Sequence, residues 1–286
     1  MIIWLASYPK SGNTWLRAFI SSILFSKDGL MHKNLWEKIP QFPLFSHFDG
    51  LVDNREVFFL KKKEHVFKIF SELINAQIKL NLDKKTKFLK THFLNCKVDK
   101  DNFTDRENTL GTIHIVRDPR NVVTSIKNHY NFQSYNETCE HMFDEQKWLV
   151  DKEKDLLFAP TLIGSWNTHY NMWKQSKKNY LLIKYEDLLN NPLNAFKIIK
   201  SYLENVMEIK IDNKVYTNAI ESTSFEKLRS MEINNEFYEN ALDKMNKKIT
   251  FFKLGSENNW KKILKAEIIK KIEKKFYNEM KELNYI

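Results

Sequence analysis

The sequence has little cysteine and no long apolar run. Only Cys96 and Cys139 occur among its 286 residues. Two cysteines argue against a disulfide scaffold, and their scarcity fits a reducing compartment. No apolar stretch approaches the ~20 residues of a membrane-spanning helix, and the N-terminus lacks the basic flank and cleavage site of a signal peptide. We therefore expect a cytoplasmic protein without a membrane span.

Metal-binding clusters, internal repeats and low-complexity tracts are lacking as well. The nearest approach to a metal pair is Cys139 with His141, whereas zinc needs three or four ligands and the sequence offers no second cluster. We therefore predict a protein that needs no metal. A hydrophobic content of 42% in a chain of this length is enough for a substantial core, in one large α/β domain or two small ones.

The charge is the first positive feature. A formal net charge of +10 suits nucleic acid, an acidic membrane surface or small polyanions. The lysines are scattered, many of them on the helix expected over residues 261–275, and no nucleic-acid-binding signature accompanies them. We therefore expect a small anionic ligand and not nucleic acid.

The first 25 residues predict a strand, a tight loop and a helix. Residues 1–8 form an apolar run with Ile and Trp, which is typical of a parallel strand covered on both faces. After a short loop around Gly12, the apolar residues from Trp15 onward fall at helical spacing, with Asn13 or Thr14 as the expected N-cap.

This strand, loop and helix make an expected anion site. The first amides of a helix lack backbone partners, and the helix dipole adds roughly half a positive charge there. Gly12 allows a close approach of the chain to an oxyanion, and Lys10 adds a full charge. The loop has one Gly, and its Lys precedes that Gly, so it is neither a Walker A loop nor a dinucleotide-binding loop. A nucleotide phosphate is the expected ligand.

Two later strands end in residues that suit the same kind of site. A strand expected over residues 87–91 is followed by His92, and one over 111–116 is followed by Arg117. Ligands of open α/β sheets lie outside the carboxyl ends of the strands. An Asp-Pro pair begins the next helix, and Ser125 lies two turns into it. An Arg can hold a phosphate with two parallel hydrogen bonds, which a nearby hydroxyl completes.

These residues resemble motifs of the cytosolic-type sulfotransferases, which use 3′-phosphoadenosine 5′-phosphosulfate (PAPS). Tyr8–Trp15 resembles the loop for the 5′-phosphosulfate, and Lys90-Thr91-His92 resembles a Lys-Thr/Ser-His motif whose His acts as general base. Arg117 and Ser125, eight positions apart, resemble the 3′-phosphate motif. The other likenesses, in the family's order, are Gly164-Ser165-Trp166 with Trp173, then Tyr185-Glu186-Asp187, Thr223-Ser224-Phe225 and residues 251–261.

The resemblance covers residues 2–261 and implies a fold and an activity. The implied fold is α/β, a single sulfotransferase domain over residues 1–286. It has a central, mostly parallel sheet flanked by helices and a P-loop-like nucleotide-binding core. The implied activity is in-line transfer of a sulfuryl group from PAPS to a hydroxyl, rather than an amine, of a small-molecule or glycan acceptor.

The resemblance also implies the site residues. Lys10 stabilises the leaving group, His92 is the general base, and Ser125 holds Lys10 away from PAPS until the acceptor binds. The implied PAPS-binding residues are Lys10, Ser11, Gly12, Asn13, Thr14, Trp15, Arg117, Ser125, Tyr185, Thr223, Phe225, Phe252, Lys253 and Gly255. Trp15, Tyr185, Thr223 and Phe225 are the ones implied to contact the adenine. No metal is implied.

The last motif departs from the family pattern. Lys253 stands for an Arg, Leu254 for a Lys and Asn258 for the second Gly of Arg-Lys-Gly-x-x-Gly-Asp-Trp-Lys. Because a Lys is a point charge and cannot make the bidentate hydrogen bonds of an Arg, we expect weaker or different binding of the 3′-phosphate. The family's Lys-Thr-Val-Glu dimer element is missing after Trp260, so the oligomeric state stays open.

The remaining segments give weaker expectations. Residues 30–52 are a loop on the core or a wall of the acceptor pocket, and residues 230–250 are a mobile loop or a lid over the cofactor. Their aromatic residues suggest a partly apolar acceptor. Helices are expected over 61–82, most of 137–157, 164–173, 192–203, 212–220 and, as one basic amphipathic helix, beyond residue 260.

Two alternatives from other classes stay open. A small-molecule or nucleotide kinase would share the strand, loop and helix, but it needs Mg²⁺ and carboxylates that hold it. A non-catalytic basic protein that binds nucleic acid or an anionic membrane would explain the charge. It would not explain the contexts of His92 and Arg117.

Overall fold

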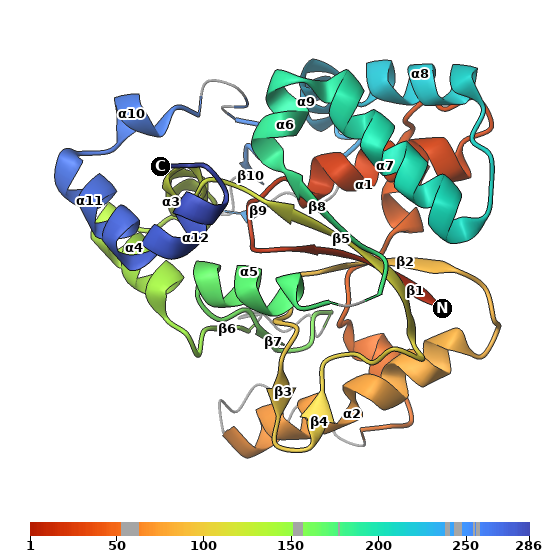
Figure 1. Ribbon diagram of the computed structural model, residues 1–286, viewed down its shortest axis with the longest axis horizontal. Helices are drawn as coiled ribbons and strands as arrows, with labels where there is room; N and C mark the ends of the chain where they lie inside the picture. Colours follow the sequence, from red (N-terminus) through yellow and green to blue (C-terminus); the bar gives the residue numbers. More distant parts are fainter. Residues whose placement is uncertain are drawn as a thin grey trace. The chain divides into compact units, whose positions relative to one another are not determined.

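The computed structural model describes residues 1–52, 63–150, 157–176, 178–237, 241–242, 248–253, 255 and 258–286 (Figure 1). By their contacts they form two units. The first comprises Met1–Tyr8, Pro40–His114 and Asp144–Leu182, and the second comprises Pro9–Ile39, Ile115–Phe143 and Ile183–Ile286.

A four-stranded sheet has the order β2-β1-β5-β8. Its strands are β1 (Ile2–Ser7), β2 (Lys87–Thr91), β5 (Thr109–Val116) and β8 (Tyr180–Lys184). β1 and β2 are parallel, and every residue of β1 is buried, as expected for a strand covered on both faces. The predicted central parallel sheet flanked by helices is confirmed.

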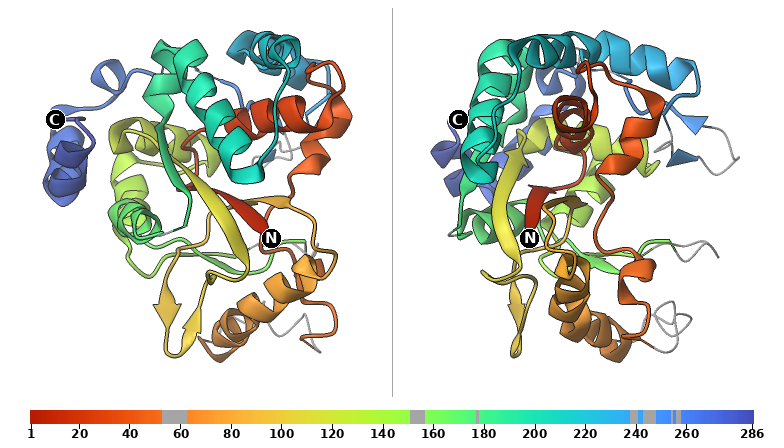
Figure 2. Two further views of the ribbon diagram at one scale, coloured as in Figure 1. Left: turned by 45° about the vertical axis from the view of Figure 1, so that its right-hand side comes forward. Right: turned by 90° about the vertical axis from the view of Figure 1, so that its right-hand side faces the viewer.

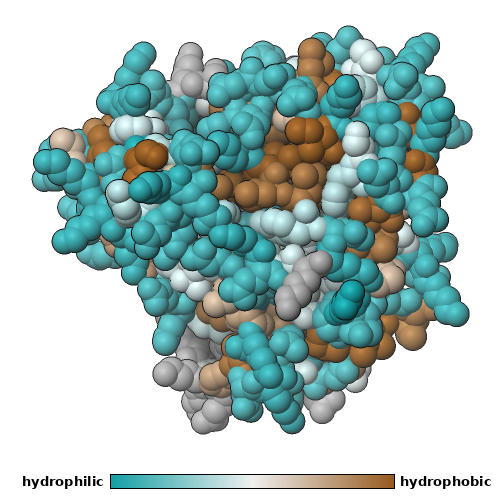
Figure 3. Space-filling model, in the orientation of Figure 1, coloured by the Kyte–Doolittle hydropathy of each residue, from teal (hydrophilic) through white to brown (hydrophobic). Residues whose placement is uncertain are grey.

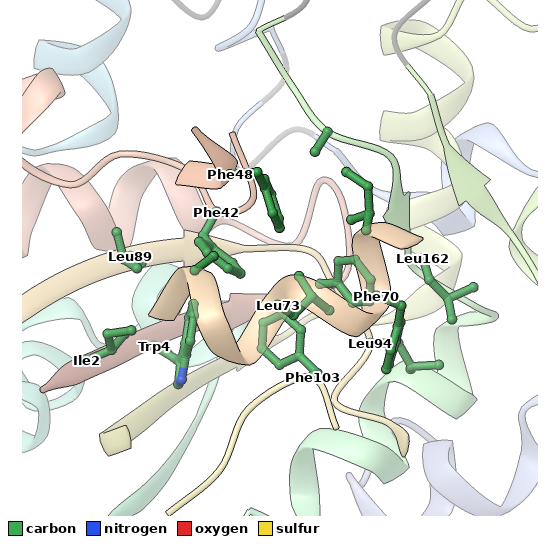
Figure 4. Close-up of a cluster of buried hydrophobic side chains, with 14 of the residues drawn as sticks. Ile2, Trp4, Phe42, Phe48, Phe70, Leu73, Leu89, Leu94, Phe103 and Leu162 are labelled. Carbon is green, nitrogen blue, oxygen red and sulfur yellow. The ribbon is translucent and has the colours of Figure 1, made fainter. Parts of the chain in front are cut away.

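An aromatic core fills the first unit. Trp4 of β1 lies 5.1 Å from the ring of Phe103 and 5.3 Å from that of Phe42, between centroids. Figure 4 shows Trp4 and Phe103 converging with Leu73 of α2 (Lys63–Asn81). The other elements of this unit are η2 (Phe45–Phe48), β3 (Lys97–Val98), β4 (Asp101–Asn102), β6 (Trp148–Leu149), β7 (Thr161–Leu162) and α5 (Trp166–Lys174).

The second unit is helical. α1 (Asn13–Phe25) packs on η1 (Lys33–Lys38) and α8 (Asn213–Ser222) (Figure 2). Phe19 of α1 stacks on Phe196 of α7 (Pro192–Met207), with 4.0 Å between ring centres. The other elements are α3 (Pro119–His129), α4 (Tyr135–Phe143), α6 (Tyr185–Asn190), α9 (Phe225–Ile233), β9 (Ala241–Leu242), β10 (Lys248–Ile249), α10 (Trp260–Ile263), α11 (Ala266–Lys275) and α12 (Tyr277–Glu282).

Several sequence-based boundaries need correction. The helix expected over much of 137–157 ends at Phe143, and Trp148–Leu149 pairs antiparallel with Thr161–Leu162. Trp148 packs edge-on against Phe93 at 6.0 Å, a tertiary contact that local periodicity does not encode. Residues 151–156 of that prediction lie outside the described residues. The single basic helix expected beyond residue 260 is three short helices, α10 to α12.

The two segments expected to be loops contain regular structure. Residues 30–52 include η1 and η2, and Phe42, Phe45 and Phe48 are buried, as expected for a segment folded onto a core. Residues 230–250 include the end of α9 and the antiparallel pair of β9 and β10. Residues 238–240 and 243–247 lie outside the described part, and the role as a lid stays a prediction.

Surface and composition agree with the sequence-based view of the lysines. α11 carries exposed lysines and mainly hydrophilic side chains on the face seen in Figure 3, which indicates a solvated face. Within the described ranges, no helix combines the length and apolarity needed to cross a bilayer. The same residues hold no group of three His, Cys, Asp or Glu side chains placed to bind a metal ion.

Candidate nucleotide site

The loop between β1 and α1 bends through left-handed conformations. Lys10 has φ 65° and Gly12 has φ 101°. Gly12 is the N-cap of α1, and its carbonyl accepts from the amides of Trp15 (3.1 Å) and Leu16 (3.3 Å). The predicted N-cap, Asn13 or Thr14, is therefore one or two residues too late. Because the N-cap is a glycine, it has no side chain to cap the helix, and the dipole there favours an anion.

Gly12 is required by its conformation and by its neighbours. A Cβ at this position would lie 2.9 Å from Cε2 of Tyr185, closer still to Cδ2, and 3.2 Å from Cδ1 of Ile115. Tyr185 is 7% exposed, so its neighbours restrict the movement of its ring. Gly12 thus lets the loop and the start of α6 lie against each other.

We expect Gly12→Ala to lower the free energy of unfolding by about 2–5 kcal/mol. Left-handed strain contributes about 1–2 kcal/mol, and overpacking against Tyr185 adds about 1–3 kcal/mol. Urea denaturation would measure the loss. Gly50→Ala is the matched control, because Gly50 has φ 76° and nothing within 4 Å of an added Cβ. Equal losses in the two variants would contradict a role for the Tyr185 contact.

Arg117, at the end of β5, brings three predicted site residues together. Its Nη1 donates to the carbonyl of Lys10 (3.1 Å) and to Oγ of Ser125 (3.2 Å). Its guanidinium carbon lies 4.2 Å from the centre of the Tyr185 ring. Arg117 is 6% exposed. The loop, α3 and α6 therefore converge on one guanidinium.

Asp118, the next residue, is paired with a different arginine. It caps α3 by accepting from the amide of Arg120 (2.9 Å), and Nη2 of Arg120 lies 2.7 Å from its Oδ2. Arg120 also donates to Glu273 (2.6 Å) and to the carbonyl of Tyr285 (2.7 Å). Local sequence pattern does not reveal the role of Arg120, because its partners are up to 165 residues distant. Because Asp118 is neutralised by Arg120, its charge does not cancel the field of Arg117.

Glu186 fixes the start of α6 behind Arg117. Its carboxylate accepts from the amide of Asp118 (3.0 Å) and from the hydroxyl of Tyr285 (2.9 Å). Burial raises the pKa of Glu186, and burial also raises the pKa of the neighbouring Tyr185. These contacts place the Tyr185 ring beside Arg117.

The aromatic residues predicted to hold adenine occupy two places. Trp15 lies edge-on to Tyr185 and to Phe196, at 6.0 Å from each. Phe225 lies 6.0 Å from Phe252 and touches the position of Gly255. Thr223 is buried, and its hydroxyl donates to the carbonyl of Ala219, so it points into its own helix. Lys253 is exposed, and Leu254 lies outside the described residues.

Lys10 lies over an aromatic ring that the sequence analysis did not single out. Its Nζ is 3.7 Å from the centre of the Phe251 ring. The amides of Phe251 and Phe252 both donate to the carboxylate of Glu232, at 2.6 and 2.8 Å, which fixes that segment against α9. In the sequence, the two consecutive phenylalanines before Lys253 were the feature that could have indicated an aromatic contact at this place.

His92, in the first unit, follows β2 as predicted. Its Nδ1 lies 2.7 Å from the carbonyl oxygen of Ser7 at the end of β1. A carbonyl oxygen only accepts, so Nδ1 carries the proton, and in the neutral ring Nε2 is the basic nitrogen. The strand ends thus fix the tautomer that a general base needs.

Together these features define a class of protein. The sheet, with a strand that runs through a left-handed loop into a helix and a buried arginine after β5, is an α/β nucleotide-binding arrangement. The family model described as "Sulfotransferase domain" matches residues 2–284, and the chain belongs to this family.

Relatives and solved structures agree with this membership. Rat "Sulfotransferase 2A1" is 22% identical over 208 residues, which are 71% of this chain and 60% of the rat protein. The chain thus spans less than two thirds of that relative's length. A mouse sulfotransferase complexed with PAP has a TM-score of 0.59 and 19% identity, covering 97% of this chain and 84% of the mouse chain.

A retinol dehydratase in complex with androsterone and inactive cofactor PAP has a similar fold. Its TM-score is 0.61 and its identity 17%, covering 98% of this chain and 80% of that chain. At these identities the structural likenesses establish the fold alone.

Proposed function

We propose that this chain is a PAPS-dependent sulfotransferase that transfers a sulfuryl group to a hydroxyl of a small-molecule or glycan acceptor. The observation that carries the proposal is the convergence of Lys10, Ser125 and Tyr185 on the buried guanidinium of Arg117. Family membership and the PAP in the two neighbouring structures support the choice of nucleotide. We also propose one functional domain over residues 1–286, because one family model crosses both units, and a cytoplasmic location.

The nucleotide is held by three groups of residues in this proposal. The loop and the first amides of α1, from Ser11 to Trp15, hold the 5′ end of PAPS. Arg117 and Ser125 hold the 3′-phosphate, supported by the hydrogen bond between them, and Lys253 adds a point charge. Tyr185, Trp15, Phe225 and Thr223 contact the adenine, and Phe252 and Gly255 belong to the segment that resembles the 3′-phosphate clamp. Thr223 would then act through its backbone or methyl group, because its hydroxyl faces Ala219.

His92 and Lys10 carry out the transfer in this proposal. The acceptor oxygen attacks sulfur, its proton passes to Nε2 of His92, and the bond from sulfur to the bridging oxygen breaks as PAP leaves. Lys10 neutralises the charge on that oxygen, an interaction of about 3 kcal/mol in related oxyanion sites. Alignment and charge stabilisation suffice for such a transfer. The Lys10 ammonium lies over the ring of Phe251, and the hydroxyl of Ser125 accepts from Arg117. The role of Ser125 in holding Lys10 away from PAPS until the acceptor binds stays a prediction.

An aromatic cluster supports a partly apolar acceptor. Trp36 and Phe237, from the two segments expected to line the pocket, lie 4.9 Å apart between ring centres. Phe237 lies 5.0 Å from Phe251, which contacts Lys10. The cluster therefore extends to Lys10, the residue assigned to the bridging oxygen of the phosphosulfate. The neighbouring retinol dehydratase was solved with retinol in one structure and androsterone in another.

The proposal predicts a preference for the nucleotide with a 3′-phosphate. Isothermal titration calorimetry should show 3′-phosphoadenosine 5′-phosphate (PAP) binding at least about 100-fold more tightly than AMP, since a bidentate, buried phosphate contact is worth about 1.5–3 kcal/mol per hydrogen bond to a charged group. Arg117→Met should remove most of this preference. Because Arg117 also donates to the carbonyl of Lys10 in the loop for the 5′ end, AMP binding should weaken too, but by a smaller factor than PAP binding. Equal affinities in the wild type would refute the proposal, and Mg²⁺-dependent binding of ATP would favour a kinase.

A further inference from the structure

Asn258 is buried against the helix that carries Ser125. The residue is 7% exposed, and its side chain contacts three residues of α3. Nδ2 donates to the carbonyl of Asn121 (3.2 Å) and to Oγ of Ser125 (3.2 Å), and Oδ1 accepts from the hydroxyl of Thr124 (2.7 Å). The family motif has a glycine here, which offers no side chain for such contacts.

The contacts fix which end of the Asn258 amide faces Ser125. The carbonyl of Asn121 only accepts, so the group beside it must be the donor, Nδ2. The amide of Trp260 also donates to Oδ1 of Asn121, at 3.1 Å, and holds the segment on α3. The orientation of Asn258 therefore follows from the backbone around it.

This orientation determines what the hydroxyl of Ser125 can do. Its oxygen accepts from Nη1 of Arg117 and from Nδ2 of Asn258, each at 3.2 Å. A hydroxyl has two acceptor lone pairs and one proton. With both lone pairs occupied, the proton of Ser125 is directed away from its two donors and is available to an anion that Arg117 also binds.

We propose that Asn258 is a positioning residue for the 3′-phosphate, which acts by orienting the hydroxyl of Ser125 as a donor. This inference rests on the proposed function. It also explains how the chain tolerates Lys253 and Leu254 at the positions of the family's Arg and Lys. The motif loses cationic donors, and the buried amide makes the Ser125 hydroxyl a fixed donor in their place.

The test compares PAP with AMP by calorimetry in Asn258 variants. Asn258→Asp replaces the donor by a carboxylate that takes the Ser125 proton and repels phosphate. We expect PAP affinity to fall about 10- to 100-fold, with AMP affinity within about twofold. Asn258→Gly restores the family residue and removes the donor without adding charge. It should lower PAP affinity by about three- to tenfold, the range for one neutral hydrogen bond.

Asn259→Ala is the matched control. Oδ1 of Asn259 accepts from the amide of Lys261 at 3.0 Å, so this variant loosens the same segment without touching Ser125. The ratio of PAP to AMP affinity should equal that of the wild type. If both Asn258 variants keep the wild-type ratio, or weaken PAP and AMP equally, Asn258 has only a structural role and the inference is wrong. A wild type that does not prefer PAP would refute the proposed function itself.

Discussion

Replacing His92 by glutamine should lower turnover by about 10²–10⁴-fold, the usual contribution of a general base, and leave PAP affinity within about twofold. Glutamine keeps a donor that can reach the carbonyl of Ser7, which now holds Nδ1–H at 2.7 Å. It has no nitrogen that can take a proton from the acceptor hydroxyl. Turnover of labelled PAPS with a panel of hydroxyl compounds, and PAP titration of the same samples, separate the two effects.

Two comparisons make the His92 experiment decisive. His32→Gln, at a histidine whose side chain is 57% exposed, should keep wild-type turnover and PAP affinity. Lys10→Met should also lower turnover, since it removes the charge assigned to the leaving oxygen. A His92→Gln variant with wild-type turnover would exclude His92 as the base, even if the nucleotide site is correct.

The parts of the site that could be predicted from the sequence are those that depend on neighbouring residues along the chain. The buried strand of residues 2–7 and the single Gly12 after it specify strand, loop and helix, because period and backbone conformation are local properties. The eight-residue spacing of Arg117 and Ser125 also predicts their contact, since a strand end and the helix that follows it have a regular geometry. The roles of these residues toward PAPS stay predictions.

The parts that sequence did not predict depend on distant contacts. Arg120, which pairs with Asp118, also donates to Glu273 and to the carbonyl of Tyr285, and these contacts join residues up to 165 positions apart. From the sequence, Asn258 is seen only as a replacement of a glycine of the family motif. Its contacts could not be predicted, because the spacing of a motif gives no information on where a side chain points. The burial of an individual polar residue could not be predicted from the sequence either, since a single histidine within an apolar run does not change the hydrophobic periodicity. His114 in β5 is an example.

Three histidines of the first unit, of which His114 and His169 are fully buried and His47 is partly buried, carry the largest expected effect on stability. Burial lowers the pKa of His114 to about 3, and burial, aided by the charge of Lys79, lowers that of His47 to about 4. Burial, with the nearby His114 and His92, lowers the pKa of His169 well below its usual value. In the unfolded chain each imidazole binds a proton near pH 6.5. The folded chain cannot bind these protons until much lower pH.

Acid should therefore destabilise the protein between about pH 6.5 and pH 4. Above this window the three imidazoles are neutral in both states, so they contribute no pH dependence. Within it the unfolded state binds more protons, and each histidine lowers the free energy of unfolding by up to about 1.4 kcal/mol per pH unit. The raised pKa of Glu186 acts in the opposite sense, because the folded state takes up that proton first, but it offsets one group at most.

Urea denaturation at pH 7.5, 6 and 5 measures this slope. His114→Gln should reduce it by about one third, since one of three proton-binding differences is lost while an amide still reaches the hydroxyl of Tyr180, now 2.8 Å from Nδ1. His32→Gln is the surface control and should keep the slope. An equal free energy of unfolding at pH 7.5 and pH 5 would mean that these imidazoles bind protons as readily in the folded chain as in the unfolded one. The interior of the first unit would then be open to water.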